Sequence, residues 1–129
     1  MASTDLQRIL YVEDEPDIQA VAQIALETVG GFTIKICENG HQALAEAATF
    51  KPDLLLLDVM MPDLDGPTTL EQLHQKPELA HIPAVFMTAK VQPQEVAHLR
   101  TLGAVDVITK PFDPMTLADK IREIWAKLP

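Results

Sequence analysis

Cysteine, aromatic residues and basic residues are all scarce in this chain. Cys37 is the single cysteine among 129 residues, which excludes an internal disulfide and a cysteine-based zinc site. There are 10 Lys and Arg against 19 Asp and Glu, and the net charge of -9 opposes direct binding to nucleic acid or anionic lipid. No apolar run approaches the roughly 18 residues of a membrane span, and no N-terminal targeting pattern is present. We therefore expect a cytoplasmic protein with no nucleic-acid or membrane partner.

The composition is typical of one globular domain. Hydrophobic residues make up 47% of the chain and charged residues 22%, which argues against a disordered or fibrous protein. A chain of 129 residues can bury a true core but leaves little room for a second module. We expect a single domain over residues 1–129, with a folded core from about residue 6 to residue 128.

Four consecutive leucines, Leu54 to Leu57, are followed by Asp58. An apolar run without alternation predicts a strand buried on both faces, as in the middle of a parallel sheet. The carboxyl end of such a strand is where open α/β sheets bind their ligands. Taken alone, Asp58 is more simply explained as a cap of the next turn or helix, so the rest of the chain must decide between the two interpretations.

Short apolar runs alternate along the chain with segments of helical periodicity. The expected strands are residues 8–12, 32–37, 54–57, 83–88 and 104–109. The first of five expected helices starts at Pro16, and the last is capped by Asp113 with Pro114 in its first turn. The apolar face of the first helix is expected to consist of Ile18, Val21, Ala22, Ala25, Leu26 and Val29. This alternation predicts an α/β fold with a five-stranded parallel sheet and right-handed crossovers.

Several chemically versatile residues are expected to be structural. Cys37 could be a redox thiol, but a small buried residue in a strand is the better interpretation. Trp125 lies at helical spacing with apolar neighbours, which favours core packing over a partner-binding role. The histidines share no ligand spacing and lie away from the strand ends, so we expect surface residues rather than a metal site: His41, His74, His81 and His98.

Polar side chains occur at the carboxyl ends of four expected strands. Glu13 and Asp14 follow the first strand, Asp58 the third and Lys110 the fifth, whereas Thr88 ends the fourth. Each alone is weak evidence, because acidic turns, Thr caps and exposed lysines are common. In a parallel sheet all carboxyl ends lie at one edge, so we expect these side chains to converge.

Three carboxylates, a hydroxyl and an ammonium group suit phosphoryl transfer to a carboxylate. Clustered carboxylates repel one another, and a hard cation such as Mg²⁺ or Mn²⁺ relieves that repulsion while it binds phosphate oxygens. Asp58 can then be the nucleophile that forms an acyl phosphate, while Lys110 and Thr88 stabilise charge on the transferring group.

These residues and further short motifs resemble the receiver domain of response regulators in two-component signalling. The motifs are Glu13-Asp14, Asp58, Met61-Pro62-Asp63-Leu64-Asp65-Gly66, Thr88-Ala89, Gly103-Ala104 and Lys110-Pro111. They occur in the family's order and cover nearly the whole chain, from about Leu6 to Leu128. The resemblance implies a three-layer, flavodoxin-like (βα)5 sandwich with strand order 2-1-3-4-5.

The resemblance also implies a switch that catalyses only its own phosphorylation and dephosphorylation. Asp58 is the expected phosphoacceptor, and a phosphohistidine of a sensor histidine kinase or histidine phosphotransfer protein is the expected donor. Asp14, Asp58 and the backbone carbonyl of Met60 are expected to ligate Mg²⁺, with Glu13 acting mostly through water. Lys110 would pair with Asp58 and then with the phosphoryl group, and its bond to the following proline is expected to be cis, as it often is in the family.

The expected readout departs from the commonest family pattern at one position. Thr88 would carry the signal outward by moving toward a phosphoryl oxygen. Many receivers place a Tyr or Phe three residues before the lysine, where the ring swings inward, but this chain has Val107. Coupling through the Thr88 loop and the next helix must then carry more of the signal, toward an output surface at about residues 93–127. Met60 and Lys90 flank the site, where long side chains could hinder the water that removes the phosphoryl group.

Two other functions use related chemistry. A metal-dependent phosphohydrolase could turn over through the same aspartyl phosphate, but haloacid-dehalogenase-type phosphatases place an acid/base aspartate two residues after the nucleophile, where this chain has Met60. A flavin-binding module is disfavoured because Glu13-Asp14-Glu15 after the first strand would repel a phosphate. The downstream protein is left open, as is the choice between a stand-alone receiver and part of a longer chain.

Overall fold

The computed structural model describes residues 5–89 and 92–128, and at its centre is a parallel sheet of five strands. The strands are β1 (Arg8–Val12), β2 (Thr33–Cys37), β3 (Leu54–Asp58), β4 (Ala84–Thr88) and β5 (Asp106–Thr109). Their order across the sheet is β2-β1-β3-β4-β5, and every neighbouring pair is parallel. This confirms the predicted fold class and strand order.

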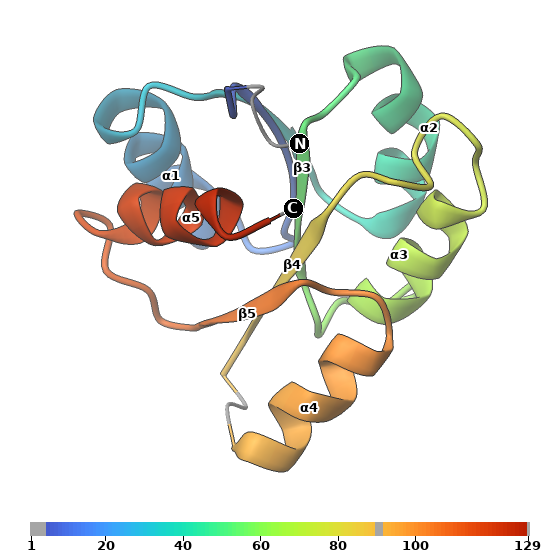
Figure 1. Ribbon diagram of the computed structural model, residues 1–129. Coiled ribbons are helices and arrows are strands. Elements are labelled where there is room, and N and C mark those ends of the chain that lie inside the picture. Colours follow the sequence, from blue (N-terminus) through green and yellow to red (C-terminus); the bar gives the residue numbers. More distant parts are fainter. Residues whose placement is uncertain (1–4, 90–91, 129) are drawn as a thin grey trace.

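Helices cover both faces of the sheet and make three layers (Figure 1). The helical elements are α1 (Pro16–Gln23), η1 (Ile24–Val29), α2 (Gly40–Phe50), α3 (Gly66–His74), α4 (Pro93–Thr101) and α5 (Leu117–Ala126). One core cluster contains residues of α1, η1 and α5, and a second contains residues of α2, α3 and α4. No helix within the described residues is long and apolar enough to span a membrane.

Strand β3 lies in the middle of the sheet and is buried along its whole length. Leu54 and Leu56 belong to the core cluster on the α1 and α5 face, whereas Leu55 and Leu57 belong to the cluster on the opposite face. The side chains of a strand alternate between faces, so a strand with helices on both sides must be apolar at every position. The leucine run was correctly predicted to be the central strand.

The first helix differs from the prediction in its second half. From Ile24 to Val29 the chain forms a π-helix, in which the amide of Gly30 donates to the carbonyl of Ala25, five residues back. Val21 and Val29, which were predicted on the buried face, are each 42% exposed, so that part of the prediction is wrong. The buried residues of the segment are Ala22, Ala25 and Leu26. The wider π turn rotates Val29 away from the direction that 3.6-residue spacing predicts, whereas Val21 lies in α1, before the π segment.

The last helix starts later than predicted. Asp113 does act as a cap, because its Oδ1 accepts from the amide of Met115 at 2.8 Å, but it caps a separate turn. Helix α5 begins only at Leu117, so Pro114 lies in that turn and not in the first turn of the helix.

Trp125 is half-buried against the core, as predicted. His74 was predicted to be a surface residue, but it is half-buried and its Nε2 lies 3.0 Å from the carbonyl oxygen of Ile82.

Gly66 fits tightly against the end of the central strand. Its amide donates to the carbonyl of Val59 at 3.0 Å, and it starts α3 directly after the N-cap residue Asp65. A Cβ atom on Gly66 would lie 2.3 Å from the carbonyl oxygen of Asp58 and 3.0 Å from Cα of Val59. Both contacts are with backbone, which cannot rotate out of the way as a flexible side chain can.

Gly66→Ala is therefore expected to destabilise the protein by about 1–3 kcal/mol. In an ordinary helix the same change would stabilise by up to about 1 kcal/mol, so the sign of the effect tests the packing. The measurement is urea denaturation followed by circular dichroism. Glu71→Ala, an exposed position on the same helix, is the control and is expected to shift stability by less than about 0.5 kcal/mol. A more stable Gly66→Ala variant would contradict the close approach.

Candidate functional site

Three carboxylates meet at the carboxyl edge of the sheet. Glu13 and Asp14 follow β1, and Asp58 is the last residue of the adjacent strand β3. One carboxylate oxygen from each lies within 4.8 Å of the others. Glu13 is completely buried, Asp58 is buried and Asp14 is half-buried. The sequence prediction that these residues converge is confirmed by this geometry.

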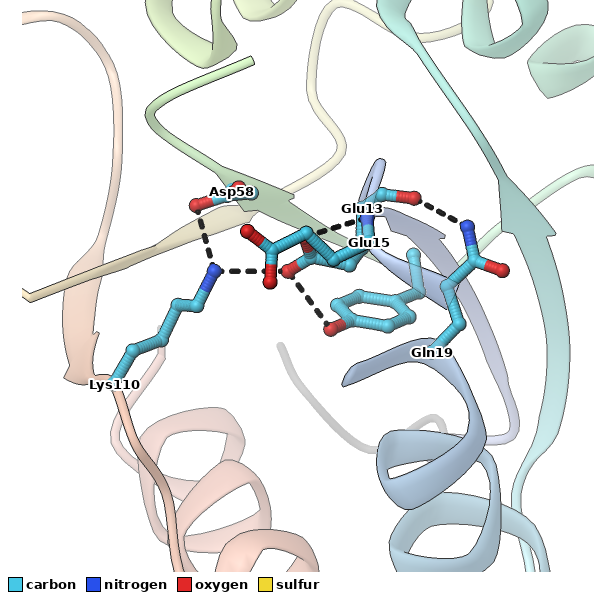
Figure 2. Close-up of polar contacts among 6 residues, drawn as sticks. Glu13, Glu15, Gln19, Asp58 and Lys110 are labelled. Atoms are coloured by element: carbon cyan, nitrogen blue, oxygen red, sulfur yellow. Dashed lines mark hydrogen bonds and ion pairs between the residues drawn. The ribbon is translucent and has the colours of Figure 1, made fainter. Parts of the chain in front are cut away.

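Lys110 lies between two of these carboxylates (Figure 2). Its Nζ is 3.0 Å from Oε1 of Glu13 and 3.2 Å from Oδ1 of Asp58. The residue follows β5 directly, and its amide donates to the carbonyl of Thr88 at 2.9 Å, which extends the ladder between β5 and β4. The bond from Lys110 to Pro111 is cis, as expected. Lys110 is thus held at the backbone while its side chain links β1 to β3.

Glu13 is held by residues that sequence reasoning did not select. Its Oε1 accepts from the hydroxyl of Tyr11 at 3.4 Å, and its Oε2 accepts from the amide of Glu15 at 3.2 Å. The side-chain amide of Gln19, on α1, donates to the backbone carbonyl of Glu13 (Figure 2). A signal for Tyr11 was present, since residues two apart in a strand point to the same face. The contact from Gln19 depends on how α1 packs and leaves no such signal.

Burial dominates the electrostatics of the carboxylates. Desolvation raises the pKa of Asp58 above its ordinary value, against the opposing effect of the nearby Lys110 charge. Desolvation also raises the pKa of Glu13, although its hydrogen bond from Lys110 acts the other way. For Lys110 burial lowers the pKa, but the hydrogen bond to Glu13 and the charge of Asp58 outweigh it and the net pKa is raised. The lysine therefore stays charged between two carboxylates.

Thr88 and Val107 lie toward the α4 side of the sheet. Thr88 is buried at the end of β4 and lines a surface hollow of about 280 Å³, together with Val59 and four residues of α4. The residues from α4 are Gln94, Glu95, His98 and Leu99. Val107 is half-buried, is paired with Phe86 in the sheet and packs on the core cluster beneath α2, α3 and α4. The two predicted switch residues thus share the α4 side.

The carboxylate group fits a small, hard cation. Mg²⁺ binds oxygen at about 2.0–2.1 Å, so oxygens on opposite sides of its shell lie about 4 Å apart. The ligand oxygens of Glu13, Asp14 and Asp58 lie within 4.8 Å of one another, close enough for one such ion to be shared among them. Lys110 neutralises one of the three charges, and a divalent cation would balance the other two.

Met60 and Lys90 were predicted to flank the site with long side chains. Met60 follows β3 by two residues, and its side chain is 67% exposed at the rim. Its backbone amide hydrogen-bonds to Asp58 and opposes the rise in the pKa of that carboxyl. The assignment of its carbonyl as a metal ligand stays a prediction. Lys90 lies outside the described residues.

A match over most of the chain identifies the family of this protein. Residues 9–122 match the model of the response regulator receiver domain. The chain belongs to this family. The predicted resemblance is therefore confirmed, and the acidic group, Lys110 and Thr88 are at the strand ends where the resemblance placed them.

Named relatives of this receiver include proteins of different length. Protein PilH of Pseudomonas aeruginosa is 36% identical over 121 residues, which cover 94% of this chain and 99% of PilH. The alkaline phosphatase synthesis transcriptional regulatory protein PhoP of Bacillus subtilis is 37% identical over 118 residues, 92% of this chain but 48% of PhoP. The chain spans about half the length of the first curated relatives it matches.

Solved structures share the fold. The signal receiver domain of a signal transduction histidine kinase from Syntrophus aciditrophicus has a TM-score of 0.80 and 31% identity, and the match covers 95% of this chain and 92% of that chain. Chemotaxis protein CheY4 of Vibrio cholerae has a TM-score of 0.85 at 23% identity, over 93% of this chain and 99% of that one. The second similarity concerns the fold alone.

In the metal-free protein, Asp58→Asn is expected to increase the free energy of unfolding at neutral pH by on the order of 1 kcal/mol. Because the pKa of Asp58 is raised by folding, the folded state binds more protons than the unfolded state between the two pKa values, and stability falls as pH rises through that interval. An amide cannot ionise and avoids this cost. Urea denaturation in the presence of a chelator, repeated across pH, measures the effect.

The increase in the free energy of unfolding of Asp58→Asn is expected to disappear at pH values below the ordinary carboxyl pKa. Asp58 of the wild type is then protonated in both the folded and the unfolded state. Asp119→Asn, an exposed position in α5, is the matched control and is expected to change stability by less than about 0.5 kcal/mol at every pH. A loss of stability in Asp58→Asn at neutral pH would show that the ion pair with Lys110 outweighs the cost of burial.

Proposed function

We propose that this receiver is a phosphorylation-dependent switch whose phosphoacceptor is Asp58. The proposed donor is a phosphohistidine on a sensor histidine kinase or a histidine phosphotransfer protein. The observation that carries the proposal is the placement of a carboxylate at the end of a fully buried central strand, 3.2 Å from a half-buried ammonium group and beside two further carboxylates. This arrangement provides a nucleophile on a rigid support together with charges that stabilise a phosphoryl group.

The transfer follows from the groups present. A carboxylate oxygen of Asp58 attacks the phosphorus, the new O–P bond forms as the N–P bond to the donor imidazole breaks, and the imidazole takes up a proton. Lys110 faces the growing negative charge from one side. Asp14, Asp58 and the carbonyl of Met60 would hold Mg²⁺, which neutralises charge on the phosphoryl oxygens when it is bound. Thr88, at the end of the adjacent strand β4, would donate to a phosphoryl oxygen.

An apolar hollow beside Lys110 supports docking of a donor protein at this edge. The hollow has a volume of about 240 Å³ and lies between α1 and the segment after β5. Its lining consists of Asp17, Ile18, Val21, Lys110, Pro111 and Phe112. A donor that delivers a phosphohistidine to Asp58 must cover this edge, and exposed apolar side chains next to the site give it contact area.

The phosphohydrolase alternative has less support. An acid/base group that protonates a leaving alcohol is expected near the nucleophile, but the residue two positions after Asp58 is Met60, which cannot transfer a proton. We propose that the aspartyl phosphate is a signalling state and that the chain acts as one receiver domain over residues 1–129.

Incubation with a small acyl phosphate and Mg²⁺ is expected to add the mass of one phosphoryl group to the wild type and none to Asp58→Asn. The adduct should be stable in acid and labile in base, as an acyl phosphate is, and should not form in the presence of a chelator. Intact mass spectrometry measures the adduct, and Trp125 fluorescence follows the reaction. Equal labelling of the two proteins would rule out Asp58, and rapid turnover of a generic phosphate ester would favour the phosphohydrolase.

Val21→Asp is expected to slow phosphorylation by a phosphohistidine protein at least tenfold while leaving labelling by the small acyl phosphate unchanged. The added carboxylate places a charge in the apolar hollow, which only a protein donor needs to cover. Ile24→Asp is the matched control, because Ile24 is 56% exposed and does not line the hollow. An equal loss in both variants would indicate a general effect of charge on this helical segment.

A further inference from the structure

The buried contact between Tyr11 and Glu13 is left unexplained by the proposed phosphoryl transfer. Tyr11 is fully buried in β1, with its hydroxyl 3.4 Å from Oε1 of Glu13. The same Oε1 accepts from Nζ of Lys110 at 3.0 Å, so one carboxylate oxygen receives two donors. A nonpolar aromatic residue would fill the same volume in the core. The hydroxyl therefore has a role that packing alone does not supply.

The role of the Tyr11–Glu13 contact follows from the position of Lys110 relative to its two carboxylates. At present Nζ is closer to Glu13 than to Asp58, at 3.0 Å against 3.2 Å. A phosphoryl group on Asp58 would bring further negative charge to that side, and the lysine is expected to move toward it. Oε1 of Glu13 would then lose its strongest donor inside a fully buried environment. A buried carboxylate oxygen without a donor costs substantial free energy, which would oppose the movement.

The geometry points to Tyr11 as a positioning residue that keeps Glu13 hydrogen-bonded when Lys110 turns to the phosphoryl group. The inference rests on the proposed function of Asp58. Its structural basis is that the Tyr11 hydroxyl already contacts the oxygen that Lys110 would leave. The other carboxylate oxygen, Oε2, keeps its own donor, the amide of Glu15. The backbone of Glu13 is anchored independently, because its amide donates to Cys37 and its carbonyl accepts from Gln19.

The arrangement of the elements agrees with this role. Tyr11 and Glu13 are two residues apart, so both side chains point to the face of the sheet that α1 and α5 cover. Asp58 is two residues beyond Leu56, which packs in the cluster on that same face. Donor, acceptor and phosphoacceptor thus lie on one side of adjacent strands, and none of these contacts crosses the sheet.

Tyr11→Phe removes the hydroxyl and keeps the ring. We expect the rate of labelling by a small acyl phosphate at saturating Mg²⁺ to fall about fivefold, since Lys110 is then held by Glu13 without a replacement donor. The urea denaturation midpoint is measured on the same samples, so that a change in folding is seen separately from a change in rate. Leu56→Val, a conservative core change on the same face, is the packing control and is expected to lower stability without a comparable loss of rate.

A second pair of variants separates positioning from a structural role. In a Lys110→Met background there is no lysine to release, so Tyr11→Phe is expected to cause no further loss of rate. Conversely, an equal fivefold loss in both backgrounds would show that the hydroxyl acts without Lys110, and it would overturn the inference. An unchanged rate in the single Tyr11→Phe variant would overturn it as well.

Labelling of the wild type distinguishes a failure of this inference from a failure of the proposed function on which it rests. If the wild type is not labelled at Asp58, the proposed phosphoacceptor fails and the role of Tyr11 fails with it. If the wild type is labelled and Tyr11→Phe behaves identically, the switch stands and only the positioning role is lost.

Discussion

The ion pairs of Lys110 are the interaction on which the rest of the site depends. Glu13 and Asp58 are both buried, and two buried carboxylates without a counter-charge would repel each other in a medium that screens poorly. One ammonium group contacts both of them, at 3.0 Å and 3.2 Å. Lys110 is 97 residues from Glu13 along the chain, and the fold brings the two together because the carboxyl ends of all five strands lie at one edge.

The ion pairs of the site and the residues of its proposed readout lie toward different faces of the sheet. Glu13, Asp58 and Lys110 form their contacts on the side covered by α1 and α5, whereas Thr88 and Val107 lie toward α4. Communication between the sides must pass around the strand ends, where the amide of Val59 donates to Met87 at 3.1 Å and that of Lys110 to Thr88. These backbone contacts connect the residues that follow β3 and β5 to the end of β4.

The sequence predicted the parts of this molecule that periodicity and strand ends determine. The leucine run implied a strand buried on both faces, and parallel strands bring their ends to one edge, so the meeting of Asp58 with Lys110 followed from the pattern. The π-helix at Ile24–Val29 and the separate turn before α5 were missed, because both depend on packing between elements. Tyr11 was counted only as a strand residue, because its two-residue spacing from Glu13 indicates a shared face but not that its hydroxyl reaches the carboxylate.

Helix α4 is weakly anchored beside the site, and this bears on how a receiver with Val107 can transmit a signal. Of its nine residues, Leu99 is the one that is buried, and the Arg100–Asp106 pair that ties it to β5 is largely exposed. Exposed ion pairs contribute little, so α4 can shift at a small cost in free energy. The hollow between Thr88 and α4 leaves room for such a shift. A valine cannot swing as an aromatic ring does, but a weakly held helix beside Thr88 does not need that ring to change its position.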